Sequence, residues 1–277
     1  MSLTQALFLG VLQGLTEFLP VSSSGHLVLA ELLLNFHVDP TDMLGFNVLL
    51  HAGSLVALLL VYARTWYTLL MAPFRRDKKN SIMLILLIVA TIPGAVAGYF
   101  LEATIAMYTQ TLLAVGIALA GTACILILGE IQPQRSRSSW HRLLHRGEQK
   151  AEPLTIRSAI FIGAAQAIAL IPGFSRSGFT ISAGRMMGLE RKQALDFSFL
   201  MAAPIIAGAS VLSAINLLTG GLHVPPADLT IPAVIASFAT SLFAIVFLRA
   251  FVVSRSLAWF SPYLLIASIT AIWVALS

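Results

Sequence analysis

The sequence predicts an all-α protein that crosses a membrane several times. Hydrophobic residues make up 58% of the chain and charged residues 10%, whereas soluble domains are about 45 to 50% apolar and about 25% charged. Continuous apolar runs of about 20 residues, each long enough to cross a hydrocarbon core of about 30 Å, recur along the chain. Because these runs do not alternate polar and apolar residues over short segments, the pattern argues against a β-barrel.

Six of the apolar runs are predicted to be plain membrane spans. The single cysteine, Cys124, lies inside the third, where we expect it to face lipid or to be packed. Because no Lys or Arg precedes Arg64, we expect no cleavable signal peptide. The predicted spans cover about residues 44–63, 82–101, 109–130, 194–218, 231–250 and 257–276.

The positive charges predict the orientation of these spans. Of the 17 Lys and Arg residues, five lie from Arg64 to Lys79 and six from Arg135 to Arg157. The positive-inside rule places the loops 64–81 and 131–157 in the cytoplasm and the C-terminus outside. Because the charges lie in loops beside the membrane, the net charge of +5 does not indicate a nucleic-acid partner.

Two further stretches, 3–38 and 154–187, are apolar at both ends and carry a cluster of Pro, Gly and Ser in the middle. Basic cytoplasmic segments flank the second stretch, so it must enter the membrane and return to the same face. We therefore predict two re-entrant helix hairpins. The count of spans places the first hairpin on the opposite face of the membrane from the second.

The two hairpins share a sequence pattern. QGLTEFLPVSSSG and QAIALIPGFSRSG both have a Gln, an apolar stretch, a Pro and a Ser-X-Ser-Gly ending. An odd number of spans follows each hairpin, so the two halves should have opposite orientations. We predict a single domain, residues 1–277, built from inverted repeats of about 1–130 and 154–277 that a basic cytoplasmic loop, 131–153, connects. Such repeats usually place a polar site at their interface near the midplane.

The first hairpin concentrates polar side chains where apolar residues are expected. Gln13 and Glu17 are four residues apart and share one face of a helix. Pro20 then ends the helix and frees backbone groups. Hydroxyl groups, N–H donors and an imidazole follow, a combination that suits an anion, from Ser22, Ser23, Ser24, Gly25 and His26.

The second hairpin contains PGFSRSGFT, with the one basic residue that does not lie beside the cytoplasm, Arg176. An ionised Arg at membrane depth is costly unless it is paired or hydrated. Its guanidinium group matches phosphate oxygens, and a Gly-Ser turn that leads into a helix presents N–H groups to the same ligand. Phosphate is the predicted partner, with neighbouring hydroxyl groups from Ser175, Ser177 and Thr180.

Together the hairpins supply what hydrolysis of a phosphoryl group requires, namely a nucleophile, a proton carrier and positive charge. Ser23 could attack with His26 as its base, or His26 and Glu17 could instead activate water. A divalent cation held by Glu17 and a pyrophosphate would offset negative charge. The sequence favours neither route.

Purely structural roles are the alternative. Ser and Gly often pack membrane helices, and a lone Glu or His can be a buried, hydrogen-bonded residue. Two polar clusters, two broken helices and an unplaced Arg together favour function. His51 could line the cavity or contact a neighbouring helix, and we favour the structural role. The remaining histidines lie in or near loops and need no functional role: His37, His141, His145 and His223.

The motifs QGLTEFLPVSSSGH and PGFSRSGFT closely resemble those of the undecaprenyl-diphosphatase family, the bacitracin-resistance phosphatases, and the likeness spans essentially the full chain. They match the family's (E/Q)xxxE and PGxSRSxxT forms. The resemblance implies six spans and two re-entrant hairpins in inverted repeat, in a bacterial inner membrane with the site open to the periplasm. It also implies hydrolysis of undecaprenyl diphosphate to undecaprenyl phosphate, which recycles the carrier for cell-wall synthesis and confers bacitracin resistance.

The resemblance also implies roles for individual residues. Glu17, Ser23, His26 and Arg176 are expected to be catalytic. Magnesium or calcium dependence is implied, with the cation shared by Glu17 and the substrate. Gln13 stands where the family often has Glu, so a metal site with two carboxylates is not expected. The expected substrate-binding residues are Gln13, Ser22, Ser24, Ser175, Ser177 and Thr180.

The expected partner is the lipid, for which bacitracin competes indirectly by binding it, and a homodimer is compatible with the sequence. A rival hypothesis is a transporter that flips polyprenyl phosphate, or moves phosphate, through the same anion site. Ser23 and His26 distinguish the two, because a carrier needs only binding groups. A third hypothesis, a structural scaffold, predicts that Arg176→Gln has little effect.

Overall fold

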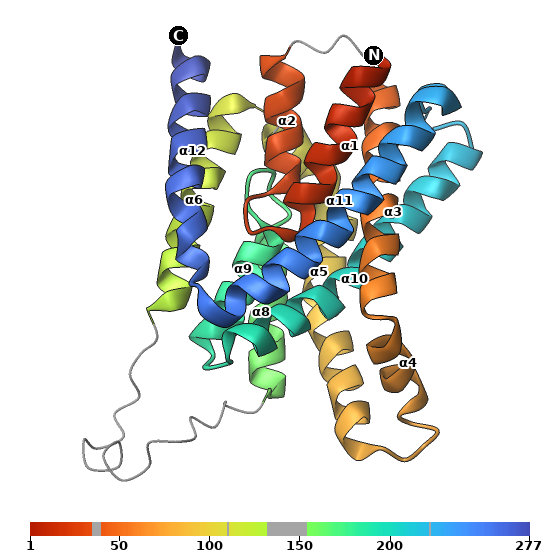
Figure 1. Cartoon of the computed structure of the whole chain (residues 1–277), viewed down its shortest axis with the longest axis vertical. Coiled ribbons are helices and arrows are strands. Elements are labelled where there is room, and N and C mark those ends of the chain that lie inside the picture. Colours follow the sequence, from red (N-terminus) through yellow and green to blue (C-terminus); the bar gives the residue numbers. More distant parts are fainter. Residues whose placement is uncertain (35–39, 110, 132–153, 222) are drawn as a thin grey trace.

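The structure is a computed structural model that describes residues 1–34, 40–109, 111–131, 154–221 and 223–277. The predicted basic loop 131–153 lies outside the described residues apart from Ile131, and so do His37, His141 and His145. Every regular element of the described segments is a helix (Figure 1). The predicted all-α class is therefore confirmed.

Among the described residues, six helices are long and apolar enough to cross a membrane, which confirms the predicted spans and makes the chain a polytopic membrane protein. A short 3-10 helix, Leu257–Phe260, leads into the last of them. Cys124 is exposed on the third span, the lipid-facing option of the two predicted. The six are α3 (Pro40–Val61), α5 (Lys78–Thr109), α6 (Leu112–Glu130), α10 (Arg191–Leu218), α11 (Ala227–Ser254) and α12 (Ser261–Leu276).

The connection between α3 and α5, predicted as a loop at 64–81, also contains a helix, α4 (Ala63–Met71). The basic and polar residues of this connection led to its interpretation as a loop. However, Leu69 is buried while Arg64 and Tyr67 on other faces are exposed. Such an amphipathic pattern forms a helix at the surface of the bundle.

Two pairs of shorter helices complete the fold. They are α1 (Leu3–Phe18) with α2 (Ser23–Leu33), and α8 (Ile156–Ile168) with α9 (Arg176–Met186). At about 1.5 Å per residue, helices of 11 to 16 residues are too short to cross a core of about 30 Å. Figure 1 shows the pairs in opposite halves of the molecule, with their turns near the middle. The turns touch, since Ser177 Oγ donates to the Leu19 carbonyl at 3.0 Å.

Close helix contacts hold each pair in the bundle. α1 packs against α11, and α8 packs against α5. Glycine makes both contacts close, because a Cβ on Gly10 would lie 2.3 Å from the Ala233 carbonyl oxygen and one on Gly163 would lie 2.4 Å from that of Ala90. Each short pair is thus packed against a span of the other half of the chain.

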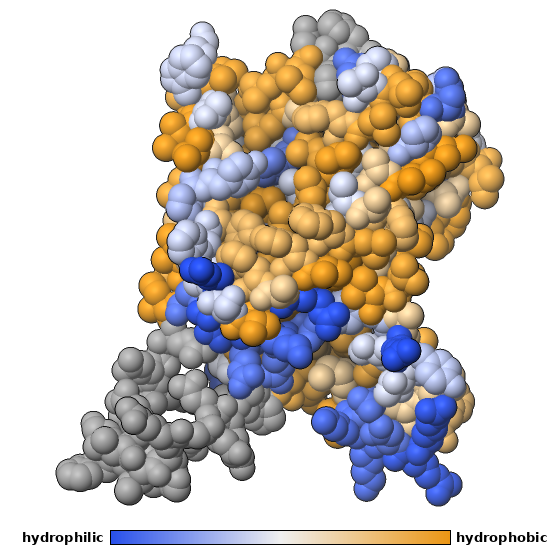
Figure 2. Space-filling model, in the orientation of Figure 1, coloured by the Kyte–Doolittle hydropathy of each residue, from blue (hydrophilic) through white to orange (hydrophobic). Residues whose placement is uncertain are grey.

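The surface agrees with a membrane protein. In Figure 2 hydrophobic side chains cover the middle of the visible face, and hydrophilic ones gather at its lower end. The turn between α4 and α5 and the start of α5 belong to this lower end, and their basic side chains are exposed: Arg75, Arg76, Lys78 and Lys79.

Candidate active site

The two turns bring two helix N-termini together at the centre of the molecule. α2 is capped by Ser22, whose hydroxyl accepts the Gly25 N–H at 3.2 Å, and α9 is capped in the same way by Ser175, which accepts the Gly178 N–H at 3.1 Å. Because Pro20 restricts the residue before it, α1 ends in extended backbone at Leu19. Helix N-termini carry partial positive charge and favour anions.

Glu17 is the buried centre of the site, with 7% of its surface exposed. Its Oε1 accepts from Arg176 Nη2 at 2.6 Å. Its Oε2 accepts from Ser23 Oγ at 2.6 Å and from Gln13 Nε2 at 2.9 Å. The carboxylate is thus paired with a cation and hydrogen-bonded on both oxygens, as a buried charge must be.

Arg176 has donor capacity that the described residues do not use. Its Nη1 is buried and has no hydrogen-bond partner among them, although Nη2 is bound to Glu17. An orphaned guanidinium donor is costly and points to an anionic ligand that accepts its hydrogen bond. Gln13 Oε1 is likewise buried and without a partner in the described part of the chain.

His26 is fixed at both ring nitrogens. Nδ1 lies 2.7 Å from the Ser22 carbonyl oxygen, and Nε2 lies 2.6 Å from Tyr263 Oη. The structure therefore brings Ser23 to Glu17, and it brings His26 to Tyr263. A direct hydrogen bond between Ser23 and His26, as the first catalytic route requires, is not among the described contacts, so that route stays a prediction.

His51, for which the sequence analysis favoured a structural role, lies at the site. Its Nε2 is 3.5 Å from Glu17 Oε2, and its Nδ1 is 2.7 Å from the Asn47 carbonyl oxygen. Asn47 in turn donates to Glu31 Oε1 at 3.0 Å. A titratable residue inside an apolar span is itself a signal of function, and this signal could have identified His51.

The other predicted binding residues mostly organise the turns. Ser22 and Ser24 hydroxyls are 3.4 Å apart, and those of Ser175 and Ser177 are 3.1 Å apart. Thr180 is buried and donates to the Arg176 carbonyl at 2.7 Å, and it shares a hydrogen bond of 2.6 Å with Ser198. Thr180 therefore holds the first turn of α9.

A metal site made by protein residues alone is absent from the described residues, where no three His, Cys, Asp or Glu side chains cluster. One carboxylate, Glu17, and the unpartnered oxygen of Gln13 face the site. Magnesium is usually held by one or two protein oxygens together with substrate phosphates. These residues therefore fit a cation that a phosphorylated substrate shares, and they do not fit a closed protein cage.

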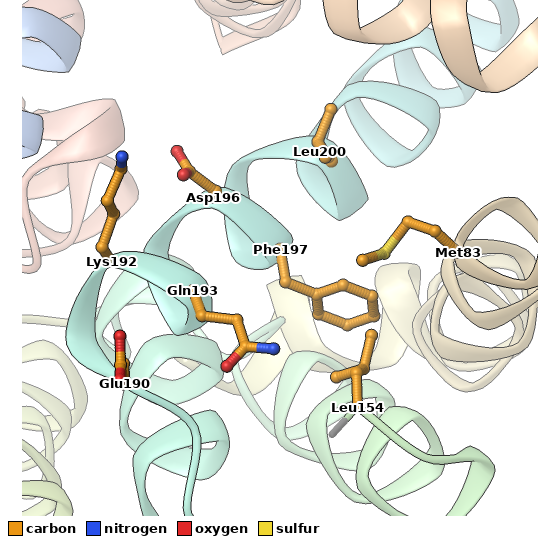
Figure 3. Close-up of a pocket in the computed structure, with 8 residues that line it drawn as sticks. All are labelled: Met83, Leu154, Glu190, Lys192, Gln193, Asp196, Phe197 and Leu200. Atoms are coloured by element: carbon orange, nitrogen blue, oxygen red, sulfur yellow. The ribbon is translucent and has the colours of Figure 1, made fainter. Parts of the chain in front are cut away.

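A separate cavity of about 330 Å³ lies between α5, α10 and the segment before α8 (Figure 3). Phe197, Met83 and Leu154 point toward one another there, and Lys192 and Asp196 also line the cavity. None of the predicted site residues lines it. The buried Glu17–Arg176 pair defines the candidate site better than this cavity does, because it unites polar groups of both turns.

Inside the helical bundle of this polytopic membrane protein, two helix N-termini meet beside a guanidinium group that has an unused donor, an arrangement that suits an anionic ligand. Its family follows from comparison with known sequences. Residues 6–270 match the family described as bacitracin resistance protein BacA, and the chain belongs to that family.

Curated relatives cover nearly the whole chain. A protein of Desulforudis audaxviator named undecaprenyl-diphosphatase is 37% identical over 275 residues, which is 98% of this chain and 97% of the relative. A protein of Burkholderia orbicola named undecaprenyl-diphosphatase 2 is 38% identical over 275 residues, 97% of this chain and 95% of the relative.

Proposed function

We propose that this protein hydrolyses undecaprenyl diphosphate to undecaprenyl phosphate and phosphate, and thereby confers bacitracin resistance. The membership of the BacA family and the shared name of the relatives support this function. The observation that carries it in the structure is the buried Nη1 of Arg176, which lacks a partner among the described residues and lies between two helix N-termini. A pyrophosphate supplies the anionic oxygens that this arrangement lacks.

In this proposal some site residues bind the substrate, and others hold the two turns in place. Arg176 binds a phosphate oxygen through Nη1, and the first turns of α2 and α9 contribute their N–H groups. The partly exposed hydroxyl of Ser24 is available to the same ligand. Ser22, Ser175, Ser177 and Thr180 hold the turns in place through the contacts described above. Substrate binding and the geometry of the turns therefore depend on one another.

Glu17 is the proton acceptor closest to a nucleophile. Ser23 donates to Glu17 Oε2 at 2.6 Å, so its proton would pass to Glu17 when its oxygen attacks the terminal phosphorus. The bond from this phosphorus to the bridging oxygen would break and release undecaprenyl phosphate, and water would then hydrolyse the phosphoserine to phosphate and free Ser23. In the alternative route a water molecule takes the position of the hydroxyl, and Glu17 or His26 accepts its proton. Both routes use Arg176 to stabilise the charge that develops on the phosphoryl group.

A divalent cation, magnesium or calcium, belongs to the proposal. Glu17 and Gln13 Oε1 are the protein atoms that would hold it, and the substrate pyrophosphate would supply further oxygens. When bound, it would offset the negative charge of the pyrophosphate.

We also propose that the short helix pairs are re-entrant hairpins and that the two halves form an inverted repeat. The lengths of the helices support this, and so does their packing. α1 packs against α11, the second span of the other half, and α8 packs against α5, which is the equivalent span of the first half. The third spans of the two halves, α6 and α12, pack against each other.

The same proposal places the protein in the bacterial inner membrane, with the site open to the periplasm. The exposed basic turn between α4 and α5 supports a cytoplasmic position for the lower end in Figure 1. The C-terminus and the α1–α2 pair lie at the other end. Bacitracin then competes indirectly, by binding the lipid before the enzyme does.

The test is to identify the products. Detergent-purified protein is incubated with undecaprenyl diphosphate in magnesium, calcium or chelator, and lipid and phosphate are both quantified. We expect equal amounts of undecaprenyl phosphate and phosphate, formed only with the cation. Folded protein that binds the lipid but forms neither product would favour the carrier hypothesis, which the names of the two relatives above do not support.

A further inference from the structure

Tyr263 on α12 reaches a histidine of the candidate site across the bundle. Its hydroxyl lies 2.6 Å from His26 Nε2, although the two residues are 237 positions apart in the sequence. The two rings are nearly parallel, with an interplanar angle of 13° and centroids 5.6 Å apart. No sequence motif includes Tyr263, and the last span would otherwise contribute nothing to the site.

The contacts of His26 determine which nitrogen carries its proton. Nδ1 lies 2.7 Å from the carbonyl oxygen of Ser22, which can only accept a hydrogen bond, so Nδ1 carries the hydrogen. In the neutral ring Nε2 is then the acceptor, and the hydroxyl of Tyr263 donates to it. Backbone of the same helix fixes one nitrogen, and Tyr263 fixes the other.

His26 and Tyr263 differ in how deeply they are buried. His26 is 7% exposed, whereas Tyr263 is 50% exposed on α12. The only side chain that hydrogen-bonds Nε2 in the described residues therefore lies at the surface of the helical bundle. A substrate that approaches His26 meets this hydroxyl on the reactive nitrogen of the ring.

We propose that Tyr263 is a positioning residue for hydrolysis, which holds the ring of His26 in the orientation and tautomer in which Nε2 is the acceptor. This inference rests on the proposed function. The proposal adds α12 to the two hairpins as a part of the site. Tyr263 acts through His26, and its hydroxyl group makes the contact.

Tyr263→Phe removes the hydroxyl and keeps the ring. We expect kcat to fall about fivefold to tenfold, as loss of one hydrogen bond in the transition state implies, with KM within about twofold of the wild-type value. Tyr99→Phe is the matched control, because Tyr99 is 76% exposed on α5 and its ring packs against Phe100 rather than against a predicted site residue. An unchanged kcat in Tyr263→Phe would overturn the proposal.

A double-mutant cycle tests whether Tyr263 acts through His26. In a His26→Gln background, Tyr263→Phe should cause no further loss of kcat, because the partner is already gone. If the two losses multiplied, Tyr263 would act on something else and the proposal would fail. Each variant is first checked for a melting temperature and a gel-filtration elution volume equal to those of the wild type, so that a misfolded variant is not mistaken for an inactive one.

Diethylpyrocarbonate provides a measurement that does not need hydrolysis. This reagent acylates unprotonated imidazole nitrogens. Tyr263→Phe frees Nε2 of His26 and should therefore increase the rate at which His26 is acylated several-fold. Exposed His223 should be acylated at the same rate in both proteins. Equal rates at His26 would contradict the contact itself. Wild type that fails to hydrolyse the lipid while His26 responds in this way would overturn the proposed function and leave the pairing established.

Discussion

Ser23 and Arg176 hold the same position in two different helices, and they donate to the two oxygens of one carboxylate, that of Glu17. Each is the first residue of its helix, after a capping serine. The two hairpin turns are thus joined through a buried acid that accepts one hydrogen bond from each. This convergence places the nucleophile candidate and the cation at the same carboxylate.

Replacement of Ser23 tests its role as nucleophile. Ser23→Ala removes the hydroxyl and should lower kcat about 1000-fold or more if the serine itself attacks. If water attacks, kcat should fall by about tenfold or less, because only a donor to Glu17 is lost. Ser254→Ala, at an exposed position at the end of α11 and outside the site, is the control. A phosphoserine trapped by rapid quenching would assign the attack to Ser23. Full activity in Ser23→Ala would rule out Ser23 as the nucleophile and leave the route through water.

His51 should affect catalysis although its position in an apolar span suggested packing. His51→Leu removes the imidazole 3.5 Å from Glu17 while keeping an apolar side chain in α3. We expect kcat/KM to fall about tenfold with little change in melting temperature. His223→Leu, at an exposed position, is the control. Equal activity of the two variants would restore the structural interpretation of His51.

A larger side chain at the contact between α1 and α11 should destabilise the protein. In Gly10→Ala the new Cβ would lie 2.3 Å from the Ala233 carbonyl oxygen, so the helices must separate. We expect a loss of about 1 to 3 kcal/mol, measured as a lower melting temperature in detergent. Gly98→Ala has nothing within 4 Å of the new Cβ and should be neutral or stabilising. Equal melting temperatures for the two variants would refute the close packing.

Cysteine labelling in cells tests the orientation. In a Cys124→Ser background, a cysteine at Ser277 should react with an impermeant maleimide, whereas one at Arg75 should react only after the cells are permeabilised. The reverse pattern would mean that the site opens to the cytoplasm.

Hydropathy and charge were sufficient to predict the spans and the two broken helices. Length and composition alone define a span, and Pro20 and the serine clusters mark the breaks. α4 was missed because Arg64 and the basic residues after the helix suggested a loop, although the segment has an amphipathic pattern that buries Leu69.

The contacts within the site were less predictable. Gln13, Glu17 and Arg176 were recognised from their cost inside a membrane, but their pairing depends on how the turns meet. Ser23 and His26 are three residues apart, which suggested a direct pair, yet the first turn of α2 directs Ser23 back to Glu17. Tyr263 could not be found locally, because only the packed bundle brings α12 to His26.

Arg176 provides the most direct test of the central claim, that the meeting point of the two turns hydrolyses a lipid pyrophosphate. Phosphate release from undecaprenyl diphosphate is measured for wild type, Arg176→Gln and the exposed control Arg64→Gln, at equal folded concentration and with magnesium or calcium. The account predicts a loss of at least about 100-fold in Arg176→Gln and wild-type rates in Arg64→Gln. Arg176→Gln that folds normally and releases phosphate within about twofold of the wild-type rate would contradict it.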